Sequence, residues 1–274
     1  MTTSRRTVLT ALAAAPALVG AGSSLAQAAS TGDTYPSNTA MYADSSLVEG
    51  TDYGRRYRRH AMEDNSLTDR YDFGRTTVIA PHGGGIETGT SELCLAIAGY
   101  HPADLSVTPA GGPVHDYWMF EALRSSDNGV MHVTSIHCDD TVARSLCAGS
   151  LNVLSLHGCT PSQAGLEAGA RAVLVGGLNT SLKQYLLGAF KTAGIRAVDA
   201  VGEEELAGVS PQNIVNRTLL SMGAQLEITT DLRAAMFGVN TRAGRKTSTT
   251  QVFWDFVAAV RTAIQRMEAE QRIA

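Results

Sequence analysis

Segment 81–87 (PHGGGIE) places an imidazole, His82, and a carboxylate, Glu87, at the two ends of a glycine run. Both side chains are common zinc ligands, and hydrolytic zinc sites take three protein ligands and leave a fourth position open for water. A second histidine, His157, ends another apolar run. These three residues therefore predict a zinc centre of the hydrolytic type.

A glycine-rich loop after a histidine also occurs in lipase-like esterases, where backbone N–H groups bind the oxyanion. That chemistry requires a nucleophilic serine in the pattern G-x-S-x-G, which occurs nowhere in the 274 residues. Two histidines and one glutamate with an open position favour zinc among divalent metals. The metal interpretation is therefore preferred.

Glu227 is the candidate general base, and it lies in the short apolar run 224–228. Side chains alternate along a strand, so Glu227 points away from the face that Leu226 and Ile228 fill. In a zinc hydrolase this carboxylate takes a proton from the attacking water and returns it to the leaving amine. The alternative is a solvent-exposed glutamate at a strand edge.

Strand-like and helix-like runs alternate around these residues, which predicts one α/β domain with a mainly parallel or mixed sheet and helices on both faces. His82 follows a β-branched strand pattern, and open α/β sheets bind ligands where their strands end. Strands are predicted over 76–80, 131–136, 152–157, 172–177 and 224–228, and helices over 91–98, 182–193 and 250–273. On a regular strand His132 and His137 face opposite ways, so they cannot both be ligands.

Residues 1–28 are predicted to be a signal peptide. Arg5 and Arg6 precede an apolar stretch over about residues 8–21, and residues 26–28 (AQA) fit a small-residue cleavage site. The twin arginine resembles a Tat signal, and the alternative is a Sec signal that contains two arginines. The apolar stretch is short for a membrane span of about 20 residues, so we expect secretion without a membrane anchor.

Loss of 28 residues from 274 leaves 246, enough for one well-cored domain. The lost segment contains two arginines and no acids, so the net charge falls from −4 to −6, which argues against nucleic-acid binding. Segment 29–72 is polar and is expected to form an arm or surface loops before a catalytic domain over 73–274. Its basic run 55–60 is either a landing site for an acidic polymer or a solvated surface segment.

Cys94, Cys138, Cys147 and Cys159 allow disulfides in an exported protein, with three connectivities. Cys138 and Cys147 flank a short loop and are the preferred pair. No two cysteines have C-x-x-C spacing, which argues against a four-thiolate zinc site. Cys159 follows His157 by two residues and either lines the site or is a small buried residue or disulfide partner.

The segment 81–92 (PHGGGIETGTSE) resembles the signature of the phage-type poly-γ-glutamate hydrolases. The resemblance extends over about residues 76–233, roughly 60% of the chain. Four shorter segments follow in the family's order: 155–159 (SLHGC), 175–178 (VGGL), 213–217 (NIVNR) and 225–228 (QLEI).

This family is related to the zinc carboxypeptidases in its α/β/α fold, and its members cut γ-glutamyl amide bonds of poly-γ-glutamate. The resemblance implies that His82, Glu87 and His157 bind one zinc ion per chain and that Glu227 is the acid/base catalyst. His82 and Glu87 are five residues apart, whereas carboxypeptidases have His-x-x-Glu, so no detailed superposition on those enzymes is expected.

The implied substrate is an anionic polypeptide with a free α-carboxylate on every residue, so we expect arginine for bidentate recognition. Arg217 and Arg233 are the candidates, and Asn213 and Asn216 would add neutral hydrogen bonds. The alternative for 213–217 is a helix cap followed by a surface arginine.

Two other functions are compatible with the sequence. A zinc amidase or peptidase acting on cell-wall γ-glutamyl peptides or N-acyl amino acids would use the same centre. A non-catalytic polymer- or wall-binding protein would keep the fold, although the retention of all four central residues argues against it.

Overall fold

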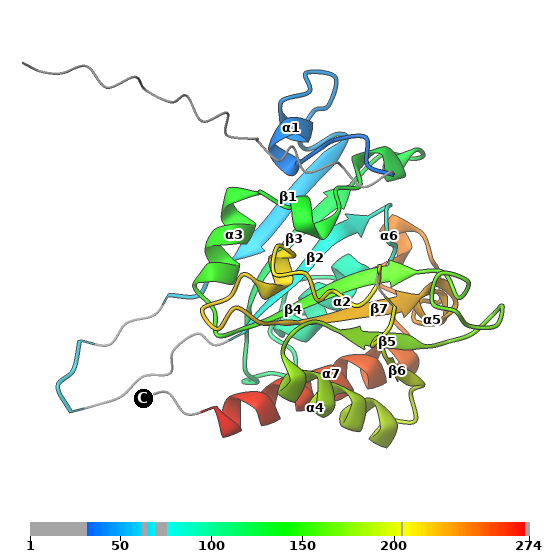
Figure 1. Ribbon diagram of the computed structural model, residues 1–274. Coiled ribbons are helices and arrows are strands. Elements are labelled where there is room, and N and C mark those ends of the chain that lie inside the picture. The colour runs from blue at the N-terminus through cyan, green and yellow to red at the C-terminus, as the bar shows by residue number, and fades with distance from the viewer. Residues whose placement is uncertain (1–31, 62–64, 69–75, 204, 272–274) are drawn as a thin grey trace, which may run out of the picture.

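The computed structural model describes residues 32–61, 65–68, 76–203 and 205–271, so the predicted signal peptide lies outside them. The strands are β1 (Tyr53–Arg58), β2 (Thr76–Gly84), β3 (Asp116–Ala122), β4 (Asn152–Cys159), β5 (Val173–Gly176), β6 (Ala197–Asp199) and β7 (Ala224–Thr229). They form one sheet with the order β1-β3-β2-β4-β7-β5-β6 (Figure 1). The central strands β3, β2, β4 and β7 are parallel, whereas β1 runs antiparallel to β3 and β5 antiparallel to β7. The predicted mixed α/β sheet is therefore confirmed.

The helices are α1 (Asn38–Tyr42), α2 (Thr90–Ala98), α3 (Thr141–Ala148), α4 (Thr180–Thr192), α5 (Thr230–Ala235), α6 (Arg242–Arg245) and α7 (Gln251–Glu270), with 3-10 turns η1 (Asn128–Met131), η2 (Ser135–His137) and η3 (Ile214–Asn216). The helices α2, α4 and α7 pack on one face of the sheet, and α1, α3 and the 3-10 turns pack on the other (Figure 1). Helices thus cover both faces, as predicted. Within the described ranges, no helix combines the length and apolar character that crossing a bilayer requires.

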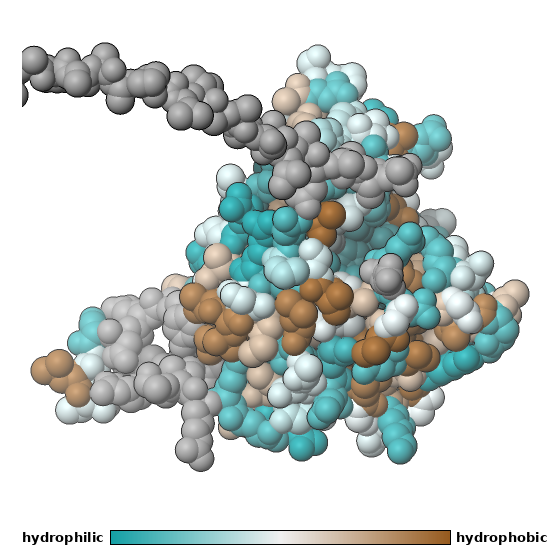
Figure 2. All heavy atoms as spheres, in the orientation of Figure 1, coloured by the Kyte–Doolittle hydropathy of each residue, from teal (hydrophilic) through white to brown (hydrophobic). Residues whose placement is uncertain are grey.

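The local sequence explains these elements. The central strands β2, β4 and β7 are buried along nearly their whole length, which is typical of parallel strands covered on both faces. In α7, Phe253, Phe256 and Val260 recur at helical spacing and enter the core. Hydrophilic residues cover much of the surface in Figure 2, and the hydrophobic ones form separate patches.

The prediction of a strand over 131–136 is wrong, because this segment runs through η1 and η2. The backbone N–H of Thr134 donates to Asp33 Oδ2 at 2.8 Å, so a side chain replaces the neighbouring strand that a ladder would need. Met131 and Val133 still enter the core. Conversely, β3 was not predicted, although it lies inside the sheet.

The polar segment 29–72 was expected to be irregular, but it contains α1 and the edge strand β1, which carries most of the basic run. Arg55 forms an ion pair with Glu49 (2.7 Å), and Arg56 forms one with Glu121 (2.5 Å). Arg58 lies over the ring of Tyr100. These paired arginines favour the interpretation as a solvated surface segment over a landing site for an acidic polymer.

The predicted disulfide between Cys138 and Cys147 is absent, and all four cysteines are free and buried. Both residues belong to the hydrophobic core on the α3 face, where they pack as small apolar side chains. Burial raises the pKa of Cys138 to about 12, so its thiol stays protonated and unreactive.

A buried ion pair joins α6 to α2 and to the end of β2. Arg245, which is 2% exposed, donates from Nε to Glu92 Oε1 at 3.0 Å. A second nitrogen of its guanidinium donates to the carbonyl of Gly84 at 3.1 Å. Arg245 therefore ties the end of β2, where the glycine loop begins, to α2 and α6.

Replacing Arg245 with methionine is expected to lower the free energy of unfolding by about 3–5 kcal/mol, because it leaves Glu92 buried without its partner. Arg196→Met is the matched control, since its ion pair with Glu167 is exposed and screened by solvent. Denaturant unfolding measures both variants. Equal effects of the two substitutions would contradict the importance of the buried pair.

Candidate metal centre

A β-bulge in β2 turns His82 toward the α3 face of the sheet. Ala80 pairs with Met119 and Gly83 with Glu121 on β3, so β2 has one extra residue between them. Ala80 belongs to the core beneath α2, and without the bulge His82 would share that face. Bulges commonly re-aim a side chain next to an active site, and this one brings His82 to the face that carries the candidate site.

The glycine loop that follows is packed against protein. Gly84 has a φ of +67°, and a Cβ at this position would lie 2.2 Å from the carbonyl oxygen of Ala122. A hydrogen bond of 2.8 Å, from the backbone N–H of Glu87 to the carbonyl of His82, joins the two ends of the loop. The absence of a side chain at Gly84 lets the loop lie against β3, which places Glu87 beside His82.

Three donor groups converge between β2 and β4. The Nδ1 atom of His82 lies 3.0 Å from Glu87 Oε1 and 3.1 Å from Nδ1 of His157. The Nδ1 atom of His157 lies 3.7 Å from Glu87 Oε2. Ligands at 2.0–2.1 Å around a tetrahedral ion are separated by about 3.3 Å, so these spacings fit one metal ion.

The far sides of both imidazoles are held by the protein. The Nε2 atom of His82 lies 2.9 Å from the carbonyl oxygen of Val133, which can only accept. This nitrogen therefore carries the proton, and Nδ1 keeps the lone pair that a metal requires. The Nε2 atom of His157 is hydrogen-bonded to Ser155 Oγ at 2.8 Å. Such outer contacts are typical of metal-binding histidines.

The carboxylate of Glu87 provides an independent test of the fit. Its Oε2 atom is buried and has no hydrogen-bond partner among the described residues. Burial alone would raise its pKa, but the adjacent His82 and His157 hold the pKa well below its usual range. A buried carboxylate oxygen without a partner requires a compensating group, and a cation between the two imidazoles would supply it.

His132 and Asp33 also reach the site. On the predicted strand over 131–136, His132 and His137 could not both be ligands, and Asp33 was not predicted to take part. The ring of His132 lies over that of His82, with centroids 3.9 Å apart. One of its ring nitrogens lies within 4.8 Å of ligand atoms of His82 and Glu87. Its Nδ1 is hydrogen-bonded to Asp33 Oδ1 at 2.8 Å, an outer contact of the same kind as those of His82 and His157. His132 is therefore a second candidate for the third ligand position, beside His157, whose Nδ1 lies 3.1 Å from Nδ1 of His82 and 3.7 Å from Glu87 Oε2.

Glu227 lies on β7 in register with His157 on the neighbouring strand β4. Its side chain lies on the face opposite to Leu226 and Ile228, as strand alternation predicted. Glu227 is only 5% exposed, so the alternative of a solvent-exposed glutamate is wrong. Burial and the negative charge of Glu87 raise the pKa of Glu227 well above its usual value. A buried carboxyl group of this kind beside a metal site suits proton transfer.

A cavity of about 690 Å³ opens over these groups, with walls from segments 132–136, 157–163 and 205–213. Among the described residues that line it, none is lysine or arginine, whereas Asp33 and Glu205 add carboxylates. Cys159 lines the cavity as well, and burial raises the pKa of its thiol to about 12. The cavity is therefore acidic apart from its histidines.

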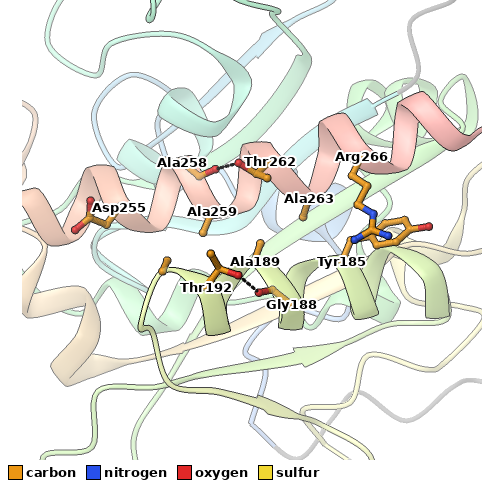
Figure 3. Close-up of a pocket in the computed structure, with 11 residues that line it drawn as sticks. Tyr185, Gly188, Ala189, Thr192, Asp255, Ala258, Ala259, Thr262, Ala263 and Arg266 are labelled. Carbon is orange, nitrogen blue, oxygen red and sulfur yellow. Dashed lines mark hydrogen bonds between the residues drawn. The ribbon is translucent and has the colours of Figure 1, made fainter.

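A second cavity, of about 640 Å³, lies between α4 and α7 (Figure 3). The hydroxyl groups of Thr192 and Thr262 donate to the carbonyls of Gly188 and Ala258 within their own helices. Small side chains form most of the remaining wall. Its ionisable lining residues in the part of the chain that the structure describes are Tyr185, Asp255 and Arg266, with no histidine or cysteine among them, so the cavity over Glu87 is the better candidate site.

The structure does not place the predicted arginines in the cavity wall. Arg217 is half-buried, and its Nε donates to the carbonyl of Gln212 at 3.0 Å. Arg233 is buried and donates to the carbonyls of Ile228 (3.0 Å) and Thr88 (2.9 Å). Arg233 therefore braces the loop that carries Glu87, and its third nitrogen, Nη2, lies 3.4 Å from the hydroxyl of Thr230.

The two asparagines differ. Asn216 is buried outside the cavity wall, and its Nδ2 donates to the carbonyls of Gly208 and Ser210 while its Oδ1 accepts from the N–H of Gly223. Its amide is therefore fully used by the backbone. Asn213 lines the cavity, but its Oδ1 caps η3, so the alternative interpretation as a cap is confirmed.

The family model described as poly-gamma-glutamate hydrolase matches residues 59–259. The SPbeta prophage-derived protein YoqZ of Bacillus subtilis (strain 168) is 34% identical over 196 residues, which cover 72% of this chain and 64% of YoqZ. The protein YndL of the same strain is 31% identical over 179 residues, which cover 65% of this chain and 63% of YndL. The chain thus spans just under two thirds of the length of these relatives.

Two solved structures share the fold. A bacteriophage poly-gamma-glutamate hydrolase superposes with a TM-score of 0.70 at 28% identity, over 87% of this chain and 100% of that one. A zinc-free structure of YndL superposes with a TM-score of 0.69 at 25% identity, over 86% and 98%. The family match covers most of the chain, and the chain therefore belongs to the poly-gamma-glutamate hydrolase family.

Proposed function

We propose that this chain is a zinc-dependent hydrolase that cleaves γ-glutamyl amide bonds of poly-γ-glutamate. The observation that carries the proposal is the convergence of donor atoms from His82, Glu87 and His157 beside the buried Glu227. Membership of the poly-gamma-glutamate hydrolase family supports the reaction, and the zinc-free description of the YndL structure supports the metal. A donor set of two histidines and one glutamate also favours zinc.

In this mechanism the two Nδ1 atoms and the Glu87 carboxylate would hold the ion, which supplies Lewis acidity and lowers the pKa of water. Glu227 takes the proton from the attacking water and returns it to the leaving nitrogen. Its raised pKa suits a carboxyl group that must retain that proton between the two transfers. The hydrogen bonds of His82 to Val133 and of His157 to Ser155 hold both imidazoles so that their Nδ1 atoms would face a bound ion.

Recognition of the polymer's α-carboxylates is proposed to use neutral donors, because Arg217 and Arg233 do not line the cavity. Hydroxyl and amide side chains line the wall at Ser135, Ser210 and Gln212. Such groups hydrogen-bond a carboxylate without the long-range attraction of an arginine.

The acidic lining favours a second candidate substrate class. Asp33 and Glu205 line the cavity, so a substrate with fewer carboxylates than poly-γ-glutamate, such as a γ-glutamyl peptide of the cell wall, meets less repulsion there. Incubation with purified poly-γ-glutamate and with wall peptides, followed by chromatography of the products, compares the two. Shortening of the polymer supports the first proposal, and release from wall peptides alone supports the second.

Two histidines compete for the third ligand position, and zinc content distinguishes them. We expect His157→Ala to lose the metal, because it removes one of three converging donors. His132→Ala is the matched control and is expected to retain roughly one zinc ion per chain. Elemental analysis of the purified proteins measures both. Loss of zinc from the His132 variant alone would reverse the assignment.

Replacing Glu227 with glutamine is expected to lower turnover by about 10²–10⁴-fold, because the amide cannot accept the proton from water. Zinc content is expected to be unchanged. Gel filtration of poly-γ-glutamate before and after incubation measures the rate. Asp255→Asn, on the exposed face of α7, serves as the control. Full activity of the Glu227 variant would exclude it as the base and leave open a non-catalytic polymer-binding protein.

We propose that the chain is exported through the Tat route, on the basis of Arg5, Arg6 and the apolar stretch that follows. Exchange of both arginines for lysine is expected to abolish export, because the Tat route reads the arginine pair. Immunoblotting of the culture medium and the cells measures the distribution. Unchanged export of the lysine variant would indicate a Sec signal instead.

A further inference from the structure

Glu227 is held by a side chain from its own strand. Gln225 precedes it by two residues on β7, so both side chains project from the same face. The Nε2 atom of Gln225 donates to Glu227 Oε1 at 2.8 Å. Both side chains are buried, so the hydrogen bond forms where solvent competes little.

The orientation of the Gln225 amide is fixed by a third residue, Asn213. The backbone N–H of Val215 donates to Asn213 Oδ1 at 3.1 Å, and a backbone N–H can only donate. Asn213 therefore turns its Nδ2 toward Gln225, where it donates to Oε1 at 3.0 Å. With its oxygen occupied in this way, Gln225 presents its nitrogen to Glu227.

The loop over residues 206–208 keeps the Gln225 amide in place. Gly208 has a φ of +62°, and a Cβ there would lie 2.8 Å from Gln225 Oε1. The Nε2 atom of Gln225 also lies 3.4 Å from the carbonyl oxygen of Leu206. The amide is thus enclosed on the side away from the strand, and its orientation follows from the backbone of η3 and of this loop.

We propose that Gln225 is a positioning residue for the catalytic carboxylate, with Asn213 setting its direction. Gln225 holds Glu227 through Oε1, so Oε2 is the oxygen that faces the cavity and exchanges the proton. The inference rests on the proposed function of Glu227. It also gives Asn213 a role other than substrate binding, because its Nδ2 is engaged by Gln225.

Gln225→Met tests this role, because methionine has a similar length and no donor. We expect kcat to fall about 10–100-fold, since outer contacts and 1 Å misplacements have effects of this size. KM and zinc content are expected to change little. Asn213→Asp is the second variant: it still accepts from Val215 but cannot donate to Gln225, so it preserves the cap and is expected to give the same loss. Circular dichroism checks folding. If Gln225→Met does not fold, Asn213→Asp provides the test.

A double-mutant cycle separates positioning from a general structural effect. If Gln225 acts through Glu227, Gln225→Met causes no further loss in the Glu227→Gln background. An unchanged kcat in the folded single variant, or the same fold-loss in both backgrounds, would overturn the proposal. Full activity of Glu227→Gln alone would instead refute the proposed base, so the two failures are distinguishable.

Discussion

The buried carboxylate of Glu87 needs a compensating positive charge, and the site is built around this requirement. Burying an ionised carboxylate without a partner is costly, yet Oε2 of Glu87 has no hydrogen-bond partner among the described residues. Two imidazoles lie within 3.0 and 3.7 Å of its oxygens. A cation held by all three groups satisfies the carboxylate and lets the histidines remain neutral, which is the form in which they bind metal.

Parallel strand pairing supplies the rest of the geometry. The register between β4 and β7 places His157 opposite Glu227, so the proposed acid/base group and one proposed ligand lie side by side on adjacent strands. His82 reaches the same face only through the bulge in β2, and Pro81 lies within it. A proline is tolerated in an inner strand at a bulge, where the ladder is already interrupted.

Strand alternation made the orientation of Glu227 predictable. The pattern over 224–228 is regular, so the burial of Leu226 and Ile228 assigned Glu227 to the opposite face. The bulge was not predictable, because a short apolar run does not reveal an extra residue in one strand. Had β2 been regular, His82 would have pointed into the core, so its place in the site was inferred from its chemistry and spacing.

The outer residues of the site were less accessible to sequence reasoning. Asp33 and His132 are 99 residues apart and meet through a turn in place of the predicted strand over 131–136. Arg233 matched the chemistry expected for carboxylate recognition, but it lies outside the cavity wall and two of its nitrogens donate to backbone carbonyls. Composition shows which donors exist, and only the tertiary contacts show which of them are already used.

Diffraction from crystals grown with zinc, recorded above and below the zinc absorption edge, tests the proposed centre most directly. We predict one anomalous peak bounded by Nδ1 of His82, Nδ1 of His157 and the Glu87 carboxylate. A peak between His132 and Asp33, or none near Glu87, would contradict the proposed metal centre.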